Sequence, residues 1–101
     1  DVRNVRDMSR MFYYSEFNGN LKRWNTKNVE NMGFMFYNAK LFNQDISRWD
    51  VSNVINMADM FNGCEKFNQD ISGWDVSKVK AHYDMFNWCP CSEEHMPKFA
   101  K

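Results

Sequence analysis

Apolar residues follow two different spacings within each stretch of about 25 residues. In the third stretch, four of them lie at positions i, i+3, i+6 and i+7, namely Val54, Met57, Met60 and Phe61. This is the spacing of one face of an α-helix. The following segment, Phe67 to Trp74, reads instead as an extended stretch with Ile71 pointing inward. Each stretch therefore predicts a short strand, a tight turn and a short helix.

Polar residues mark the ends of the predicted helix. Ser52 precedes the apolar stripe and suits an N-cap, because its hydroxyl oxygen can accept a bond from a free backbone N–H. Asn62-Gly63 follows the stripe, and glycine ends helices because it adopts the left-handed conformation without penalty. Equivalent helices are expected over residues 26–38 and 2–14.

The whole pattern repeats with a period of 25 residues. Residues 42–54 return as residues 67–79, with eleven of the thirteen positions identical. With a one-residue gap allowed in the shorter first repeat, three kinds of residue align in all four repeats and tryptophan in three: Val5, Val29, Val54 and Val79; Met11, Met35, Met60 and Met85; Phe12, Phe36, Phe61 and Phe86; Trp24, Trp49 and Trp74. Repeats of this length bury their apolar face by stacking on copies of themselves. We predict one α/β solenoid domain over residues 1–101, with repeats near 1–25, 26–50, 51–75 and 76–89 and a C-terminal cap over 90–101.

The repeat resembles that of the BspA-like leucine-rich-repeat surface proteins. The shared letters are Phe-Asn-Gln-Asp-Ile-Ser-x-Trp-Asp-Val-Ser-Asn-Val-x-x-Met-x-x-Met-Phe, and the similarity covers about residues 1–89. It implies a curved leucine-rich-repeat-like β/α solenoid, with short parallel strands on one face and short helices on the other. It also implies an extracellular or cell-surface location and a role in adhesion. It implies no catalytic residue.

Charge and composition narrow the classes of partner. The 13 basic and 13 acidic residues cancel, so no overall field attracts nucleic acid. No apolar run approaches the ~20 residues of a membrane span. No phosphate loop, nucleophile elbow or His-Glu-x-x-His motif is present, so we expect neither an enzyme nor a cofactor.

Three cysteines allow three interpretations. Cys64 and Cys89 occupy one repeat position, where the second repeat has Ala39, which favours small buried residues. A disulfide among Cys64, Cys89 and Cys91 is the second interpretation, since an oxidising compartment is expected. The third is zinc bound by Cys89 and Cys91 together with the two histidines, His82 and His95. The spacing is not a standard zinc motif, and no metal is predicted.

Polar residues repeat as regularly as apolar ones, so stacking would turn them into columns. The columns and variable positions of the strand face form the candidate binding surface: Asn43, Asp45, Ser47, Arg48, Asn68, Asp70 and Ser72. Stacked carboxylates repel, so Asp45 and Asp70 must accept backbone N–H bonds or share a cation such as calcium. Asp50 and Asp75 stand two residues before a serine, which favours Asx-turns.

Stacking also predicts a tryptophan column, buried in the core or, on an open face, forming a platform for sugar rings. Positions that differ between repeats lie on the surface, where solenoids acquire specificity. Three such positions stand out: Arg23, Arg48 and Gly73; Glu30, Ile55 and Lys80; Phe34, Asp59 and Asp84.

We therefore predict a non-enzymatic protein-interaction or scaffold module that binds a protein partner or joins a larger assembly. The alternative is carbohydrate or glycoprotein adhesion through exposed Trp and Asn/Asp columns. The first repeat has no cap, which predicts end-to-end stacking between copies.

Overall fold

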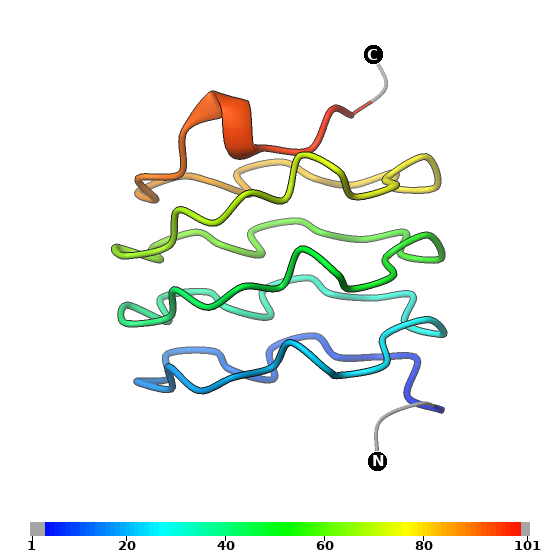
Figure 1. The fold of residues 1–101 in the computed structure, drawn as a ribbon, viewed down its shortest axis with the longest axis horizontal. Helices are drawn as coiled ribbons and strands as arrows, with labels where there is room; N and C mark the ends of the chain where they lie inside the picture. Colours follow the sequence, from blue (N-terminus) through cyan, green and yellow to red (C-terminus); the bar gives the residue numbers. More distant parts are fainter. Residues whose placement is uncertain (1–3, 100–101) are drawn as a thin grey trace.

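The chain winds into flat coils that lie one on another. The computed structural model describes residues 4–99, and Figure 1 shows the coils rising from the N-terminal to the C-terminal end. Isolated parallel bridges mark equivalent positions of successive coils, joining Asp7 to Asn31, Asn31 to Asn56 and Asn56 to Ala81. Segments 24 or 25 residues apart are therefore neighbours in space.

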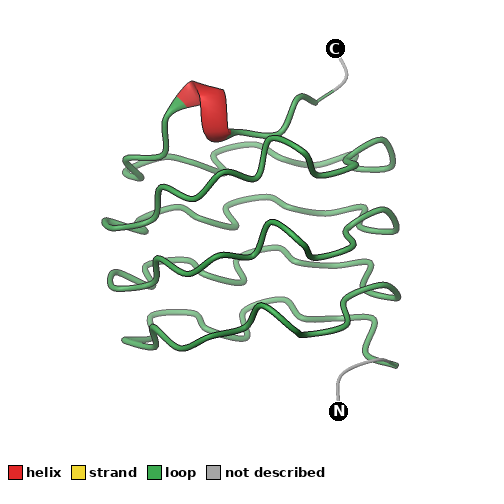
Figure 2. Cartoon of the chain, viewed as in Figure 1, coloured by secondary structure: helices red, strands yellow, loops and turns green. Residues whose placement is uncertain are grey.

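The predicted secondary structure is wrong. Within residues 4–99 the only helix is η1, a 3-10 helix over Glu93–His95, and there is no β-sheet (Figure 2). Neither the helices expected over 26–38 and 52–62 nor the strand expected over 67–74 forms. The helix expected over 2–14 is also absent from its described part, 4–14, while residues 2 and 3 lie outside the described residues. The chain is not an α/β solenoid, and nothing in this backbone supports a leucine-rich-repeat solenoid.

Overlapping turns replace the predicted helices. In the second coil, alternate backbone N–H groups donate to carbonyls of the next coil. The N–H of Phe34 donates to the carbonyl of Ala58 at 2.9 Å, and that of Phe36 donates to the carbonyl of Met60 at 2.9 Å. The N–H between them, on Met35, donates to the carbonyl of Met32, three residues back, at 3.2 Å. An α-helix would need all of these donors for bonds to the fourth preceding residue. Here half of them join the coils instead.

Left-handed residues are the second reason that no helix forms. Two residues four positions apart have positive φ in each coil: Arg10 and Tyr14, Phe34 and Asn38, Asp59 and Gly63, Asp84 and Trp88. A residue with positive φ cannot continue a right-handed helix. In the second and third coils the Met-x-x-Met-Phe stripe is nevertheless buried, because the turns repeat its spacing.

Asparagine side chains join the coils on the opposite side, where strands were predicted. The Oδ1 atom of Asn18 accepts the N–H of Asn43 at 2.9 Å, and that of Asn43 accepts the N–H of Asn68 at 3.1 Å. The Oδ1 atom of Asn68 accepts the N–H of Ser92 at 3.0 Å. Each bond takes a side-chain acceptor where a β-sheet would use a backbone carbonyl, which is why no strand ladder forms.

Aromatic rings fill the core in stacked columns. Phe36 and Phe61 lie 5.6 Å apart between ring centroids at 3°, and Trp49 and Trp74 lie 6.5 Å apart at 5°. The Nε1–H of Trp74 donates to the carbonyl of Ile46 at 3.1 Å, which satisfies its polar atom inside the core. The predicted contact between equivalent tryptophans is therefore confirmed.

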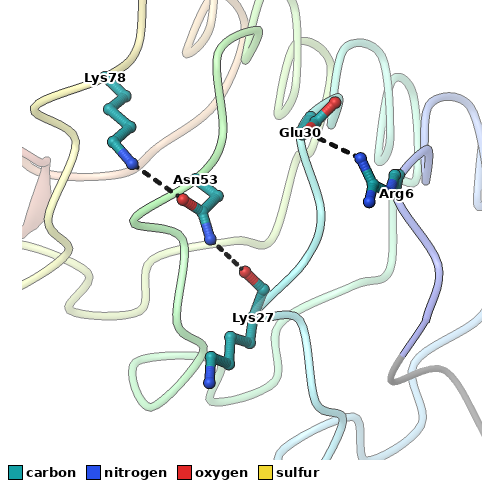
Figure 3. Close-up of polar contacts among 5 residues, drawn as sticks. All are labelled: Arg6, Lys27, Glu30, Asn53 and Lys78. Atoms are coloured by element: carbon teal, nitrogen blue, oxygen red, sulfur yellow. Dashed lines mark hydrogen bonds and ion pairs between the residues drawn. The ribbon is translucent and has the colours of Figure 1, made fainter.

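Polar contacts tie the loops at one edge of the stack (Figure 3). Asn53 donates from Nδ2 to the carbonyl of Lys27 at 2.8 Å and accepts from Nζ of Lys78 at 3.0 Å, so it links three coils. Nearby, Arg6 and Glu30 form an ion pair at 3.6 Å.

The tail lies over the last coil. His95 accepts the N–H of Ile71 at its carbonyl at 2.9 Å, and Phe99 stacks on His82 at 3.9 Å between ring centroids.

Candidate functional site

The asparagines predicted as binding residues have structural roles. Besides the ladder bonds, the Nε2 of Gln69 donates to the Oδ1 of Asn43 at 2.9 Å and to its carbonyl at 3.2 Å. Asn68 also contacts Nδ1 of His95 at 2.9 Å through Oδ1. These contacts use the acceptors that a ligand would need, so Asn43 and Asn68 hold the coils together.

The predicted aspartate and serine residues pair with one another. Asp45 accepts the N–H of Ser47 at 2.9 Å and its hydroxyl at 2.7 Å, while Asp70 accepts the same two groups of Ser72 at 3.0 and 2.6 Å. These are Asx-turns, in which an aspartate bonds the backbone two residues on. Hydrogen bonds from the serine hydroxyl first, and then from its N–H, lower the pKa of both carboxyls. Each carboxylate is therefore satisfied locally, which was the first of the two predicted solutions.

The turns predicted at the other aspartate column are confirmed. Asp50 accepts the N–H of Ser52 at 3.0 Å, and Asp75 accepts that of Ser77 at 3.1 Å. Across residues 4–99, no group of three or more His, Cys, Asp or Glu side chains is placed to hold a metal ion.

The cysteines of the described chain are free thiols, so the predicted disulfide is not formed in this structure. Cys64 is fully buried and donates to the carbonyl of Phe36 at 2.9 Å, as a small core residue does. Burial raises the pKa of Cys64 far above its ordinary value and that of Cys91 to about 12, and it also raises the pKa of Cys89. All three thiols are therefore protonated at neutral pH and poorly nucleophilic.

Arg48, the last predicted binding residue, lines a surface hollow of about 590 Å³. We call it the basic hollow, and it is lined by Asn20, Lys22, Arg23, Trp24 and Arg48. Arg23 and Arg48 occupy one position in successive coils. No carboxylate within residues 4–99 forms an ion pair with a cation of this hollow. These positive charges are therefore available to an anion.

The tryptophan column does not form an open platform. Trp49 and Trp74 are only 3% and 5% exposed, which confirms the core interpretation for these two rings. Trp24, at the end of the column, is half-buried; it stacks on Trp49 at 6.5 Å and borders the basic hollow.

A surface cluster of aromatic side chains was not predicted as a site. We call it the aromatic cluster, and it consists of Arg10, Tyr13, Tyr14, Phe34 and Tyr37. Tyr13 is 43% and Tyr14 60% exposed, and the ring of Tyr13 stacks on that of Tyr37 at 5.4 Å. Phe34 lies 5.3 Å from Tyr37, and the guanidinium of Arg10 lies 5.2 Å from the centre of the Phe34 ring. The rings fix one another, so this surface is apolar and largely preorganised.

The surroundings of Tyr37 favour its neutral phenol. The neighbouring Tyr14, more than desolvation, Tyr13 and Asp59, raises the pKa of Tyr37 above its ordinary value. Tyr37 therefore remains a neutral phenol, able to donate a hydrogen bond, well beyond neutral pH.

The cluster ends abruptly between the second and third coils. At the positions of Phe34 and Tyr37 the third coil has Asp59 and Asn62, and the Nδ2 of Asn62 donates to Asp59 at 2.9 Å. The fourth coil repeats this pair with Asp84 and Asn87 at 3.0 Å. The variation at the position of Phe34 was noted from the sequence. A second position changes at the same repeat, from Tyr13 and Tyr37 to Asn62 and Asn87, and this change was the signal that the sequence analysis missed.

Comparison with known proteins places the chain in a family. Residues 1–99 match the family described as "Mycoplasma protein of unknown function, DUF285". No curated protein matches the chain, and no solved structure does. The assignment to the BspA-like leucine-rich-repeat proteins is therefore wrong, because the repeat letters that suggested it belong here to a different family. The chain belongs to the DUF285 family.

Proposed function

We propose that this chain is a non-enzymatic interaction module that binds another protein through the aromatic cluster. The observation that supports it is the exposure of Tyr13 and Tyr14 in a ring cluster held by Arg10. Tyrosine and arginine are enriched among the residues that contribute most to the binding energy of protein interfaces. Side chains that are already held in place lose little conformational entropy on binding.

The experiment is a comparison of captured proteins between three forms of the chain. The wild type and two variants are immobilised and exposed to a detergent extract of the source organism, and specific partners are identified and then purified. Tyr13→Ala/Tyr14→Ala should lower the affinity for a purified partner by tenfold or more, since hot-spot truncations cost ~2 kcal/mol or more. Tyr83→Ala is the control, because Tyr83 is 65% exposed and lies outside the cluster.

Two results would count against the proposal. One is equal binding of a partner by the wild type and the double variant. The other is an equal loss in the Tyr83→Ala control, which would show that exposed tyrosines in general determine binding.

The location of the protein remains a prediction. An extracellular or cell-surface position is consistent with an interaction module, and labelling of intact cells with a membrane-impermeant biotin reagent tests it. Labelling only after lysis would contradict it. No helix of the described residues is long and apolar enough to cross a membrane.

A further inference from the structure

The basic hollow goes beyond the protein-binding surface proposed above, because none of its residues belongs to the aromatic cluster. Lys22, Arg23 and Arg48 line it with exposed side chains, and hydrogen bonds from Ser47 first, then the charges of Lys22 and Arg48, lower the pKa of the neighbouring Asp45 carboxyl. Both hydrogen bonds recorded for Asp45 go to one oxygen, from the N–H and hydroxyl of Ser47. The lining holds three cations and no carboxylate, so the hollow is locally positive although the chain has no net charge.

Stacking explains why the arginines converge. Arg23 and Arg48 are equivalent residues of adjacent coils, so their backbones lie on the same side of the stack, one coil apart. Guanidinium groups bind carboxylates through two parallel hydrogen bonds, which favours an anion of this shape. The third coil has Gly73 at the same position, so the arginine pair ends there.

The remaining lining residues indicate which kind of molecule bears the anionic group. Trp24 offers an indole ring at the edge of the hollow, and Asn20 offers a side-chain amide. The Oδ1 of Asn20 accepts the N–H of Lys22 at 2.8 Å, which leaves its amide N–H groups for a ligand. An indole ring packs against the apolar face of a sugar ring, and an amide can donate to its hydroxyl oxygens.

We propose that the basic hollow binds a carboxylate-bearing sugar, with the carboxylate on Arg23 and Arg48 and the sugar ring against Trp24. The volume of about 590 Å³ suits one or two sugar rings. The site is open and its cations are exposed, so binding is salt-dependent.

The test is an NMR titration that follows the indole N–H of Trp24 and the side-chain N–H groups of Arg23 and Arg48. Trigalacturonate is the probe, and neutral trigalactose and inorganic sulfate are the comparison ligands. We expect trigalacturonate to shift these signals with an affinity that falls as salt rises, and sulfate to bind more weakly. Trigalactose should leave them unchanged at the same concentrations.

Variants distinguish binding at the hollow from non-specific attraction to positive charge anywhere on the surface. Arg23→Gln and Arg48→Gln should each weaken binding about two- to fivefold, the upper part of the range expected for exposed ion pairs. Trp24→Leu should weaken it severalfold, while an unchanged indole signal of Trp74, which lies one coil beyond the Trp49 ring that contacts Trp24, shows that the stack persists. Lys66→Gln removes the same charge at an exposed position outside the hollow and should bind as the wild type does.

Four results would overturn the proposal: no shift at the hollow, equal binding of trigalactose, equal binding of sulfate, or an equal loss in Lys66→Gln. The Tyr13→Ala/Tyr14→Ala variant distinguishes this site from the protein-binding surface. It should bind trigalacturonate as the wild type does, whether or not it binds a protein partner.

Discussion

At the scale of single residues, short side chains determine the turns of this molecule. Aspartates two positions before a serine accept both its N–H and, at Asp45, Asp50 and Asp70, its hydroxyl. Hydrogen bonds to the ionised carboxylate favour that form, which is why the pKa values of these carboxyls are lowered. The repeated aspartate and serine residues thus determine the conformation of the turns and make the stability of the fold sensitive to acid.

The first prediction concerns this acid sensitivity. The pKa of Asp50 in the folded chain lies below that of an unfolded aspartate, about 3.9. Its ionised form therefore stabilises the fold at pH values above about 4, and this contribution is lost as pH falls through the folded pKa. Ser52→Ala should raise the pKa of Asp50, measured by NMR titration, and should lower the stability at pH 7 more than at pH 3. Ser92→Ala should leave it unchanged, and an unchanged Asp50 pKa in Ser52→Ala would show that the hydroxyl bond is unimportant.

A second prediction at this scale compares two glycines. Gly63 has φ of +82°, and an added Cβ would fall on the amide oxygen of Asn38. Gly63→Ala should therefore lower the free energy of unfolding by about 1–3 kcal/mol, as expected for backbone strain. Gly73 has nothing within 4 Å of an added Cβ, so Gly73→Ala should be neutral or slightly stabilising. Urea unfolding measures both, and equal effects would contradict the left-handed turn at Gly63.

At the scale of elements, the coil replaces both helix and strand. One side of each coil sends alternate backbone N–H groups to the next coil, and the other side uses an asparagine in place of a backbone carbonyl. Because each side has its own inter-coil bonds, a coil needs no regular secondary structure to stack.

A third prediction tests this ladder. Asn43→Ala removes the acceptor for the N–H of Asn68 and for the amide of Gln69, so it should destabilise the fold by about 1 kcal/mol. Asn43→Asp retains the acceptor oxygen and should cost less. Thermal unfolding of the two variants measures the difference, and equal melting temperatures would argue that the acceptor does not matter.

The register of the stack could be predicted from the sequence, but its local structure could not. Identical letters 25 residues apart led to the contact between Trp49 and Trp74, and the Asp-x-Ser spacing led to the Asx-turns. The spacing of Met57, Met60 and Phe61 fits overlapping turns as well as a helix, and residues such as Phe34 and Trp88 give no local sign of positive φ. The helix prediction therefore failed where the hydrophobic pattern was strongest.

Some residues of the candidate sites could likewise be predicted from the sequence, and others could not. The predicted asparagine column exists, and Asn43 and Asn68 bond neighbouring coils; that their side chains replace the backbone carbonyls of a strand ladder could not be read from the repeat. Arg48 lines the basic hollow, and its variable position was noted from the sequence, as was that of Phe34. Only the structure brings Tyr13 and Tyr14 beside Tyr37 and so forms the aromatic cluster.

At the scale of the whole molecule, the two ends of the stack differ from its middle. In the second coil, four carbonyls accept N–H groups from the first coil. The equivalent carbonyls of the first coil accept no backbone N–H from residues 4–99, and they belong to Asp7, Ser9, Met11 and Tyr13. In the last coil, four N–H groups have no acceptor within that range: His82, Asp84, Phe86 and Trp88. The free acceptors of the first coil favour contact with a second copy at that end, whereas the tail covers part of the last coil at His82.

The fourth prediction is therefore concentration-dependent association of this chain. Sedimentation velocity should show larger species as the concentration rises, and Met11→Lys should suppress them, because Met11 is 41% exposed on the first coil. Leu41→Lys is the control, since Leu41 is equally exposed but lies in the second coil. A monomer at all concentrations would contradict end-to-end stacking and leave the lateral sites untouched.

The stacked architecture rests on contacts between equivalent residues of adjacent coils. Nuclear Overhauser spectroscopy measures these contacts directly, between the amide of Phe34 and residues around Ala58, between the amide of Asp59 and residues around Tyr83, and between the indole rings of Trp49 and Trp74. We predict cross-peaks for all three pairs. Their absence, together with a continuous helical pattern over residues 52–62, would contradict the stacked coils and the sites built on them.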